Sequence, residues 1–477
     1  MTPGIAATDE QRTRRRPLGC EAALMEAQRR VELLDGELRS FITWTGATAL
    51  DQARDHDAAA SRGEWLGPLA GVLVAVKDNI ATSGVRTTSG SRLFEHFVPR
   101  QDATVVRRLQ RAGAVLVGKC NMAELAWGAT TQNVAFGSCR NAWDPRRIPG
   151  GSSGGSGVAV AAGFCQMALG TDTGASTRIP ASVNGVVGLR PTLGRISNAG
   201  ITPVSPSQDT VGPMAQSVAD VARLTAVLSG WDPEDPFSLR PDGPSPVEGL
   251  LGSADGLRIG VVEGYFIEGL DAGVAQCFTE ASRLLERLGA RLTKVEVPGA
   301  EEAGEHWTRI VSAEGAAVHR ADIETRPEMF SPDVLARISE GLSGSRAELA
   351  ESLLWRANYR TTLMRLLGEI DLLVAPTIGT DVPFIEGYDS RGQTRELGRL
   401  TYPWALHRGP TMSLPVGFHP DSGMPVGLAI VAAPWQEATA VRAGADYQRH
   451  TEWHRIEPTY VKKVLSTRQT AVRDSEQ

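Results

Sequence analysis

Three polar features stand out from an otherwise apolar background. Lys77 directly follows the apolar run VLVAV, Ser152 lies in the glycine–serine run GGSSGGSG, and Ser176 lies in the stretch GTDTGASTRIP. A serine hydroxyl is a weak nucleophile unless a base takes its proton, and no histidine lies in these three stretches. Lysine can act as that base when desolvation lowers its pKa from about 10.4 and leaves the amine neutral. These residue types therefore suit catalysis by a lysine-activated serine.

Each feature, taken alone, also has a structural explanation. A lysine after a strand is often solvated or ion-paired, and a glycine–serine run is often a loop or linker. Asp172 or Thr173 could cap a helix. A glycine-rich loop before a helix can bind phosphate, but the pattern GxxxxGK[ST] is absent because no lysine follows the run. Taken one at a time, the structural explanations are preferred, and catalysis is favoured only because the three features together resemble a known pattern.

The elements around these residues alternate between short apolar runs and helical patterns. Buried strands are predicted at VLVAV, AVLVG, LRIGVVEG, RLTKVEV, IDLLVAPT and PVGLAIVAAP. Apolar residues have helical spacing at 24–38, 158–165 and 274–288, and EATAVRAGADYQRH is a late helix. TVVRRLQRAG looks helical up to Gly113, and residues 300–368 are mostly helical. This alternation predicts an α/β/α fold, with one mixed, mainly parallel twisted sheet covered by helices on both faces.

The two serines are 24 residues apart, with a predicted helix and a short strand between them. The helix is expected to begin where the glycines end. A helix that runs out and a strand that runs back bring Ser152 and Ser176 to the same end of the sheet.

The chain divides into three predicted regions. Residues 1–60 form an N-terminal tail, which contains the basic cluster RTRRR, followed by a helical segment. Residues 61–465 form a single domain that includes the helical segment at about 300–368, and residues 466–477 form a C-terminal tail. The stretch RPDGPSPVEG is a loop within that domain, because strands alternate with helices on both sides of it.

Composition narrows the class of protein. The chain has 477 residues, with 49 basic and 55 acidic residues and a net charge of -6, which gives no electrostatic case for nucleic acid. No apolar stretch is long enough for a signal peptide or a membrane span. The five cysteines show no CxxC spacing, so reduced thiols are expected. We therefore expect a cytoplasmic monomer or homodimer that uses no metal or other cofactor and binds neither nucleic acid nor membrane.

The order of these motifs resembles that of the amidase signature family. The resemblance is carried by GPLAGVLVAVKDNI, GAVLVGKCNMAEL, FGSCRNAWD and the long stretch from GGSSGGSG to LRPTLGRIS, and it resumes in DLLVAPT and MPVGLAIVAAPW. It covers most of the chain beyond the first 60 residues. It implies the α/β/α fold of that family and a catalytic Ser–Ser–Lys triad.

The resemblance also implies a role for each residue. Ser176 matches the nucleophile, Ser152 the bridging serine that is typically held by a cis peptide bond, and Lys77 the base. The backbone N–H groups of the next set match the oxyanion hole: Thr173, Gly174, Ala175 and Ser176. The following residues match groups that orient the loop: Thr171, Asp172 and Arg178. The chain departs from the family in having GAS where GGS is usual, and Ala175 is tolerated if its φ is negative.

The motifs indicate the fold and the catalytic residues but do not encode the substrate class. The ending TEWHRIEP resembles that of general-purpose amidases, and no cationic cluster lies beside the motifs, so we expect an apolar pocket for aryl or alkyl amides, esters and carbamates. The wall of the pocket is expected to come from residues 122–132 and 305–360.

One alternative function is that of an amidohydrolase for a small urea-like or carboxylated amide. A second is a protein similar to the amidase-type component of the glutamine amidotransferase that works on charged tRNA, although Ile179 replaces the glutamine usual there. A third is a binding protein without turnover.

Overall fold

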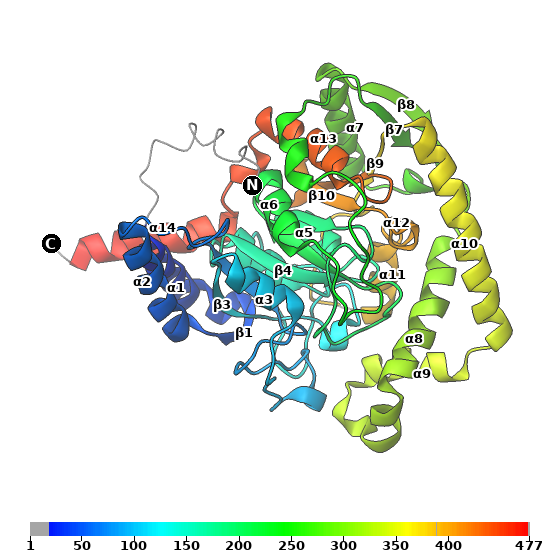
Figure 1. Cartoon of the computed structure of the whole chain (residues 1–477). Helices are drawn as coiled ribbons and strands as arrows, with labels where there is room; N and C mark the ends of the chain where they lie inside the picture. Colours follow the sequence, from blue (N-terminus) through cyan, green and yellow to red (C-terminus); the bar gives the residue numbers. More distant parts are fainter. Residues whose placement is uncertain (1–18, 388, 476–477) are drawn as a thin grey trace.

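One sheet of eleven strands forms the centre of the molecule, with helices packed on both faces (Figure 1). The structure is a computed structural model that describes residues 19–387 and 389–475. The strands are β1 (Phe41–Trp44), β2 (Leu73–Lys77), β3 (Val115–Cys120), β4 (Met167–Asp172), β5 (Val187–Arg190), β6 (Thr210–Ala215), β7 (Arg258–Val262), β8 (Arg291–Val295), β9 (Leu372–Pro376), β10 (Thr411–Phe418) and β11 (Pro425–Val431). The helices are α1 (Cys20–Leu38), α2 (Gly46–Ser61), α3 (Thr104–Arg111), α4 (Gly154–Ala161), α5 (Arg178–Asn184), α6 (Val218–Leu228), α7 (Ala272–Arg287), α8 (Ala303–Thr325), α9 (Pro332–Ser343), α10 (Arg346–Glu369), α11 (Ser390–Gly398), α12 (Tyr402–His407), α13 (Glu437–Arg449) and α14 (Thr459–Ser475).

The sheet has the order β1-β3-β2-β4-β6-β5-β10-β11-β9-β7-β8. Four neighbouring pairs are parallel and six are antiparallel. The sheet is therefore mixed, as the sequence predicted, but the expectation that it is mainly parallel is corrected. Successive strands such as β5 and β6, or β10 and β11, follow each other without a helix between them, and such neighbours pair antiparallel.

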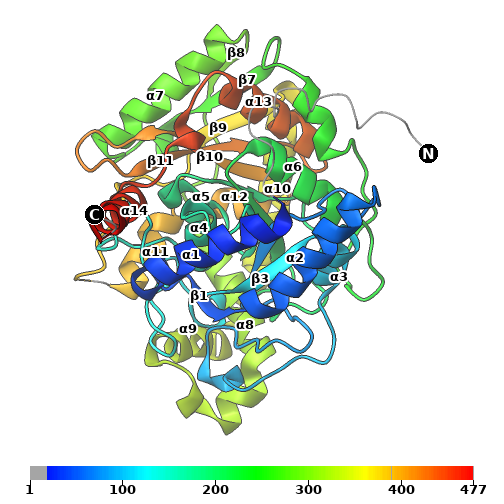
Figure 2. The same ribbon diagram turned by 90° about the vertical axis from the view of Figure 1, so that its left-hand side faces the viewer.

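The alternation of side chains along β2 separates the two faces of the sheet. Leu73 and Ala75 belong to the cluster that contains residues of α1, α2, α4 and α14, whereas Val74 and Val76 belong to the larger cluster with α3, α6, α7 and α13. Figure 2 shows α1 and α2 in front of the sheet. Side chains two apart in a strand share a face, so this pattern directs Lys77 toward the α4 face.

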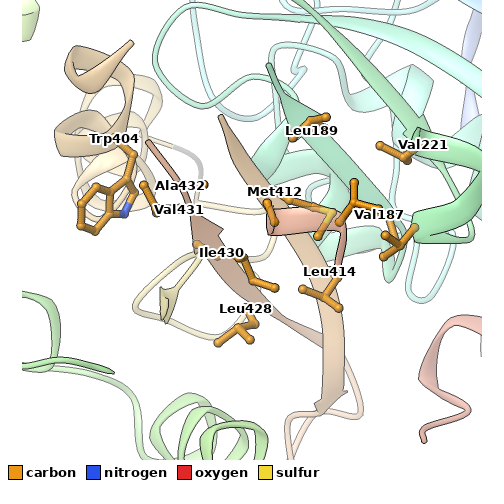
Figure 3. Packing of buried hydrophobic residues seen from close by; sticks show 14 of the residues in the cluster. Val187, Leu189, Val221, Trp404, Met412, Leu414, Leu428, Ile430, Val431 and Ala432 are labelled. Carbon is orange, nitrogen blue, oxygen red and sulfur yellow. The ribbon is translucent and has the colours of Figure 1, made fainter. Parts of the chain in front are cut away.

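The centre of the larger cluster lies over β5, β10 and β11. Figure 3 shows Leu189, Met412, Leu428 and Ile430 from these strands, with Trp404 of α12 nearby, and all five side chains are fully buried. Interiors of this kind are close-packed. β2 and β4, which end at Lys77 and Asp172, contribute Val76 and Leu169 to the same buried cluster.

Several elements differ from the sequence-based expectations. α4 begins at Gly154, inside the glycine–serine run rather than after it. β1 pairs with β3 within the segment expected to be only helical, and β5, β6 and β10 were not predicted. α14 extends to Ser475, where a tail was expected from residue 466, because Val461 and Leu465 pack into the α1 cluster. The basic cluster RTRRR lies outside the described residues.

The described residues also bear on cofactors and membranes. Within ranges 19–387 and 389–475, no helix is long and apolar enough to cross a membrane. The same ranges contain no group of three or more His, Cys, Asp or Glu side chains placed to hold a metal ion. All five cysteines are free and buried.

Candidate active site

Lys77 and Ser152 meet below the surface at the end of β2. The Nζ of Lys77 lies 2.7 Å from Oγ of Ser152 and 2.8 Å from Oγ1 of Thr171. Lys77 and Ser152 are both 0% exposed. The side-chain amide of Asn79 donates to the same Thr171 hydroxyl at 3.3 Å. The lysine therefore has hydroxyl neighbours and is shielded from bulk water.

The glycine–serine run that carries Ser152 is a buried, closely packed segment and not a linker. The peptide bond between Gly151 and Ser152 is cis, as the family resemblance implies. A Cβ on Gly151 would lie 2.5 Å from the backbone nitrogen of Thr130, and one on Gly155 would lie 2.4 Å from the carbonyl oxygen of Ser40. Glycine is required at these two positions because other backbone segments approach so closely.

Ser176 lies in the turn between β4 and α5 and is accessible from solvent. Unlike Lys77 and Ser152, it is only partly buried, and it lines a pocket. The backbone N–H of Ser153 donates to the carbonyl oxygen of Ser176 at 3.3 Å. The hydroxyl of Ser153 donates to the carbonyl oxygen of Thr171 at 3.1 Å. These bonds hold the two serine-bearing segments together.

The backbone of the Ser176 turn presents free hydrogen-bond donors. The N–H groups of Gly174, Ala175 and Ser176 donate to no acceptor among the described residues, and all three residues line the pocket. Buried backbone donors are normally paired, so unpaired ones beside a cavity suit the recognition of an oxygen that carries negative charge. Ala175 is not among the seven described non-glycine residues with positive φ, and its methyl group is accommodated.

Two side chains that the sequence did not single out support the same turn. The hydroxyl of Thr173 donates to Asp209 at 2.5 Å, and the indole N–H of Trp307 donates to the carbonyl oxygen of Thr173 at 3.2 Å. A Cβ on Gly174 would lie 2.4 Å from the Trp307 ring. No local pattern points to Asp209 or Trp307, because each reaches the turn only through the fold.

Burial shifts the pKa values of two polar residues at this site, Lys77 and Asp209. Desolvation lowers the pKa of Lys77 from 10.5 to about 7, against the opposing effect of Asp172 and Asp209. Desolvation raises the pKa of Asp209 to about 6, which its hydrogen bonds partly offset. A large fraction of the Lys77 amines is therefore neutral near pH 7 and able to accept a proton.

A buried ionic network fixes the end of β4. Two nitrogens of the Arg178 guanidinium donate to the carboxylate of Asp172, each at 3.0 Å. The same carboxylate accepts from Arg190 at 3.3 Å and from the backbone N–H of Thr177 at 3.1 Å. Arg178 also donates to the carbonyl oxygen of Gly174 at 2.6 Å. Burial raises the pKa of Asp172, but the two guanidinium groups outweigh it and hold the pKa at about 2. Asp172 and Arg178 thus hydrogen-bond to the backbone of the Ser176 turn, which is consistent with the orienting role that the resemblance implies.

Substitution of Asp172 by alanine is expected to lower the free energy of unfolding by about 3–5 kcal/mol, because two buried guanidinium groups lose their counter-charge. The measurement is urea unfolding at pH 7. Since the folded pKa lies below the usual 3.8, the contribution of Asp172 is present above pH 3.8 and is lost as the pH falls toward 2. Glu305→Ala, which breaks an exposed pair with Arg309, is the control. A loss of less than about 1 kcal/mol for Asp172→Ala would contradict the structural role.

A pocket opens over the Ser176 turn. Its walls come from residues 126–129, from α8 and α9, and from α11 together with Tyr402. Residues 126–129 and the parts of α8 and α9 that line the pocket lie in the regions predicted from the sequence, whereas α11 and Tyr402 were not predicted. The rings of Trp307 and Tyr402 stack with centroids 4.2 Å apart.

Three arginines also line this pocket, whose lining is otherwise mainly apolar, as the sequence predicted. Arg337 comes from α9, and Arg391 and Arg395 come from α11. None of them lies near the motifs in the sequence, so no local pattern indicated a cationic cluster.

The structure brings together most of the residues that the sequence indicated. Lys77, Ser152 and Thr171 form one hydrogen-bonded group, and the carbonyl oxygen of Ser176 accepts a hydrogen bond from Ser153, the next residue after Ser152. Residues 173–176 all line the pocket. The residues that sequence reasoning missed are Asn79, Ser153, Arg190, Asp209, Trp307 and Tyr402; of these, Asn79, Ser153 and Arg190 lie within the quoted motifs.

The chain is similar to known proteins over most of its length. A family model described as Amidase matches residues 22–441. A relative from Chloroflexus aurantiacus, named as a component of glutamyl-tRNA(Gln) amidotransferase, is 40% identical over 457 residues, which cover 91% of this chain and 93% of the relative.

Solved structures agree in fold over nearly the whole chain. One, described as a vestigial protein complex that reveals the evolutionary origins of an s-triazine catabolic enzyme, has a TM-score of 0.86 and 35% identity, and covers 91% of this chain and 95% of that one. Another, 6-aminohexanoate cyclic dimer hydrolase complexed with substrate, has a TM-score of 0.83 and 28% identity, and covers 95% of this chain and 98% of that one.

Proposed function

Because the chain belongs to the amidase family, we propose that it cleaves the C–N bond of a small amide through an acyl-enzyme on Ser176. The observation that carries this proposal is the 2.7 Å contact between the Lys77 amine and the Ser152 hydroxyl, buried beside the Ser176 turn. A desolvated lysine with a pKa of about 7 is a suitable base at neutral pH.

In the first half of the reaction, Ser176 Oγ attacks the amide carbonyl carbon. Its proton passes to Ser152, and the Ser152 proton passes to Lys77. The N–H groups of residues 173–176 stabilise the oxyanion, and each such donor is worth roughly 10²–10³ in rate. The proton then returns through Ser152 to the leaving nitrogen as the C–N bond breaks.

In the second half, water attacks the ester carbonyl of the acyl-enzyme. The water proton passes through Ser152 to Lys77 and returns to Ser176 Oγ when the ester bond breaks. The products are a carboxylic acid and a free amine or ammonia, and no cofactor takes part. Esters and carbamates present the same carbonyl group, so this route also admits them.

The arginines of the pocket favour a charged substrate over the neutral anilides expected from the sequence. Arg337, Arg391 and Arg395 line the same cavity as Ser176. Among the alternatives, an amidohydrolase that acts on a small carboxylated amide fits this cavity better than a general-purpose amidase. A promiscuous amidase or urethanase remains the competing proposal.

A second candidate function is the release of ammonia from glutamine as one component of an amidotransferase. The specific observation in its favour is the 40% identity to the amidotransferase component of Chloroflexus aurantiacus over 91% of the chain. In that case the chain would work with other proteins of the complex, and not as the monomer or homodimer proposed from the sequence. Free glutamine as a substrate tests this candidate directly.

One experiment tests the proposed function. Labelling with a fluorophosphonate followed by peptide mapping is expected to mark Ser176 and no other serine. A hydrolysis panel then includes a neutral anilide, an ester, a carbamate, a monocarboxylated primary amide and glutamine. Absence of label on Ser176 together with no turnover of any amide would overturn the proposal, and would favour a binding protein.

A further inference from the structure

The three arginines that line the pocket are not equivalent. The guanidinium of Arg391 pairs with Glu340 at 2.8 Å. That of Arg337 pairs with Asp333 at 3.2 Å and also donates to Ser390. The guanidinium of Arg395, in contrast, makes no hydrogen bond or ion pair with any described residue. Arg395 therefore has all of its donors available.

The charges of these arginines and of the carboxylates paired with them do not cancel. Three guanidinium groups face two carboxylates, those of Glu340 and Asp333, so that one positive charge is left uncompensated. Both carboxylates are already engaged by Arg337 and Arg391. An anion that enters the pocket would therefore find Arg395 without competition from a protein carboxylate.

The side chain of Arg395 is exposed, but the backbone that carries it is connected to the catalytic turn. The hydroxyl of Tyr402 donates to the carbonyl oxygen of Thr394 at 3.1 Å, so α11 is anchored on the ring that stacks against Trp307. Trp307 in turn donates to the carbonyl oxygen of Thr173 in the Ser176 turn. One chain of contacts thus connects α11, which carries Arg395, to the Ser176 turn.

We propose that Arg395 binds a carboxylate at the end of the substrate remote from the scissile amide, so that the substrate class is a small amide bearing an anionic group. This inference rests on the proposed function, because it describes the substrate of the same site. A guanidinium offers two parallel N–H donors to a carboxylate, which gives both affinity and orientation. The stacked rings of Trp307 and Tyr402, which line the same pocket, would contact the apolar spacer of the substrate.

The test compares two substrates of equal length, succinamate and the neutral methyl ester of succinamic acid, in which the carboxylate is masked. The wild-type protein is expected to prefer succinamate in amide kcat/KM. Arg395→Ala is expected to lower the ratio of the two kcat/KM values about 10- to 100-fold, and Arg395→Lys by less. Guanidinium added to Arg395→Ala is expected to restore part of the ratio. Arg346→Ala, an exposed arginine on α10 outside the pocket, is the matched control.

A binding measurement separates failure of this inference from failure of the proposed function. Titration of the Ser176→Ala protein with succinamate reports on Arg395 even if no amide is turned over. Weaker binding after the added Arg395→Ala substitution supports the carboxylate site. An unchanged affinity, or an unchanged ratio of kcat/KM values in the active protein, overturns it. Arg395-dependent turnover of glutamine would support the carboxylate site too, and would then favour the amidotransferase candidate.

Discussion

Ser176→Ala is expected to lower kcat for amide hydrolysis by about 10⁴- to 10⁶-fold, because no covalent intermediate can form without the hydroxyl. The fold should be unaffected, since Ser176 is only partly buried and lies in a turn. The measurement is steady-state kinetics on the amide that is turned over best in the panel. Residual activity would come from the backbone donors and from binding alone.

The control for this substitution is Ser61→Ala, an exposed serine at the end of α2. It should retain full activity and full labelling by a fluorophosphonate. Retention of more than about 1% of the activity by Ser176→Ala would remove Ser176 from the role of nucleophile. Label on another serine in the wild-type protein would have the same consequence.

Lys77→Ala is expected to lower kcat by about 10³-fold or more and to change the pH profile. The pKa of Lys77 is lowered to about 7 by burial, and only the neutral amine accepts a proton. The wild-type rate should therefore rise as the pH increases through about 7 and fall about tenfold per unit of pH below it. In the variant the acidic limb assigned to Lys77 should be absent from the remaining activity.

The same lysine affects stability in a direction that can be checked. Its folded pKa of about 7 lies below its ordinary value of 10.5, so between these pH values the unfolded chain binds more protons than the folded one. Stability from this group therefore increases with pH across that interval. Lys77→Met should remove the increase, whereas Lys462→Met, which changes an exposed lysine of α14, should leave it in place. If wild type and Lys77→Ala have the same pH profile of activity and the same rate, Lys77 is only a structural cation.

The pattern of residues predicted the strands and helices near the motifs because each is encoded locally. VLVAV is long and apolar enough to be a buried strand, and it is β2. The apolar spacing at 274–288 matches α7, although the helix ends at Arg287. β5, β6 and β10 were missed because their short apolar runs alternate with glycine, proline and polar residues, and only their neighbours in the sheet make them strands. Sheet order and strand direction likewise depend on contacts between distant segments.

The sequence by itself determined which side chains could carry the chemistry, since Lys77, Ser152 and Ser176 lie in motifs whose order and spacing are specific. Burial of Lys77 could also be anticipated, because an apolar strand precedes it. Only the tertiary structure decided what surrounds them. Trp307, Asp209 and the arginines of α9 and α11 lie far from the motifs in sequence, and their positions depend on how helices pack against the sheet. No local sequence pattern therefore identified the individual side chains that contact the substrate, because the pocket wall is assembled from segments that meet only in the folded chain.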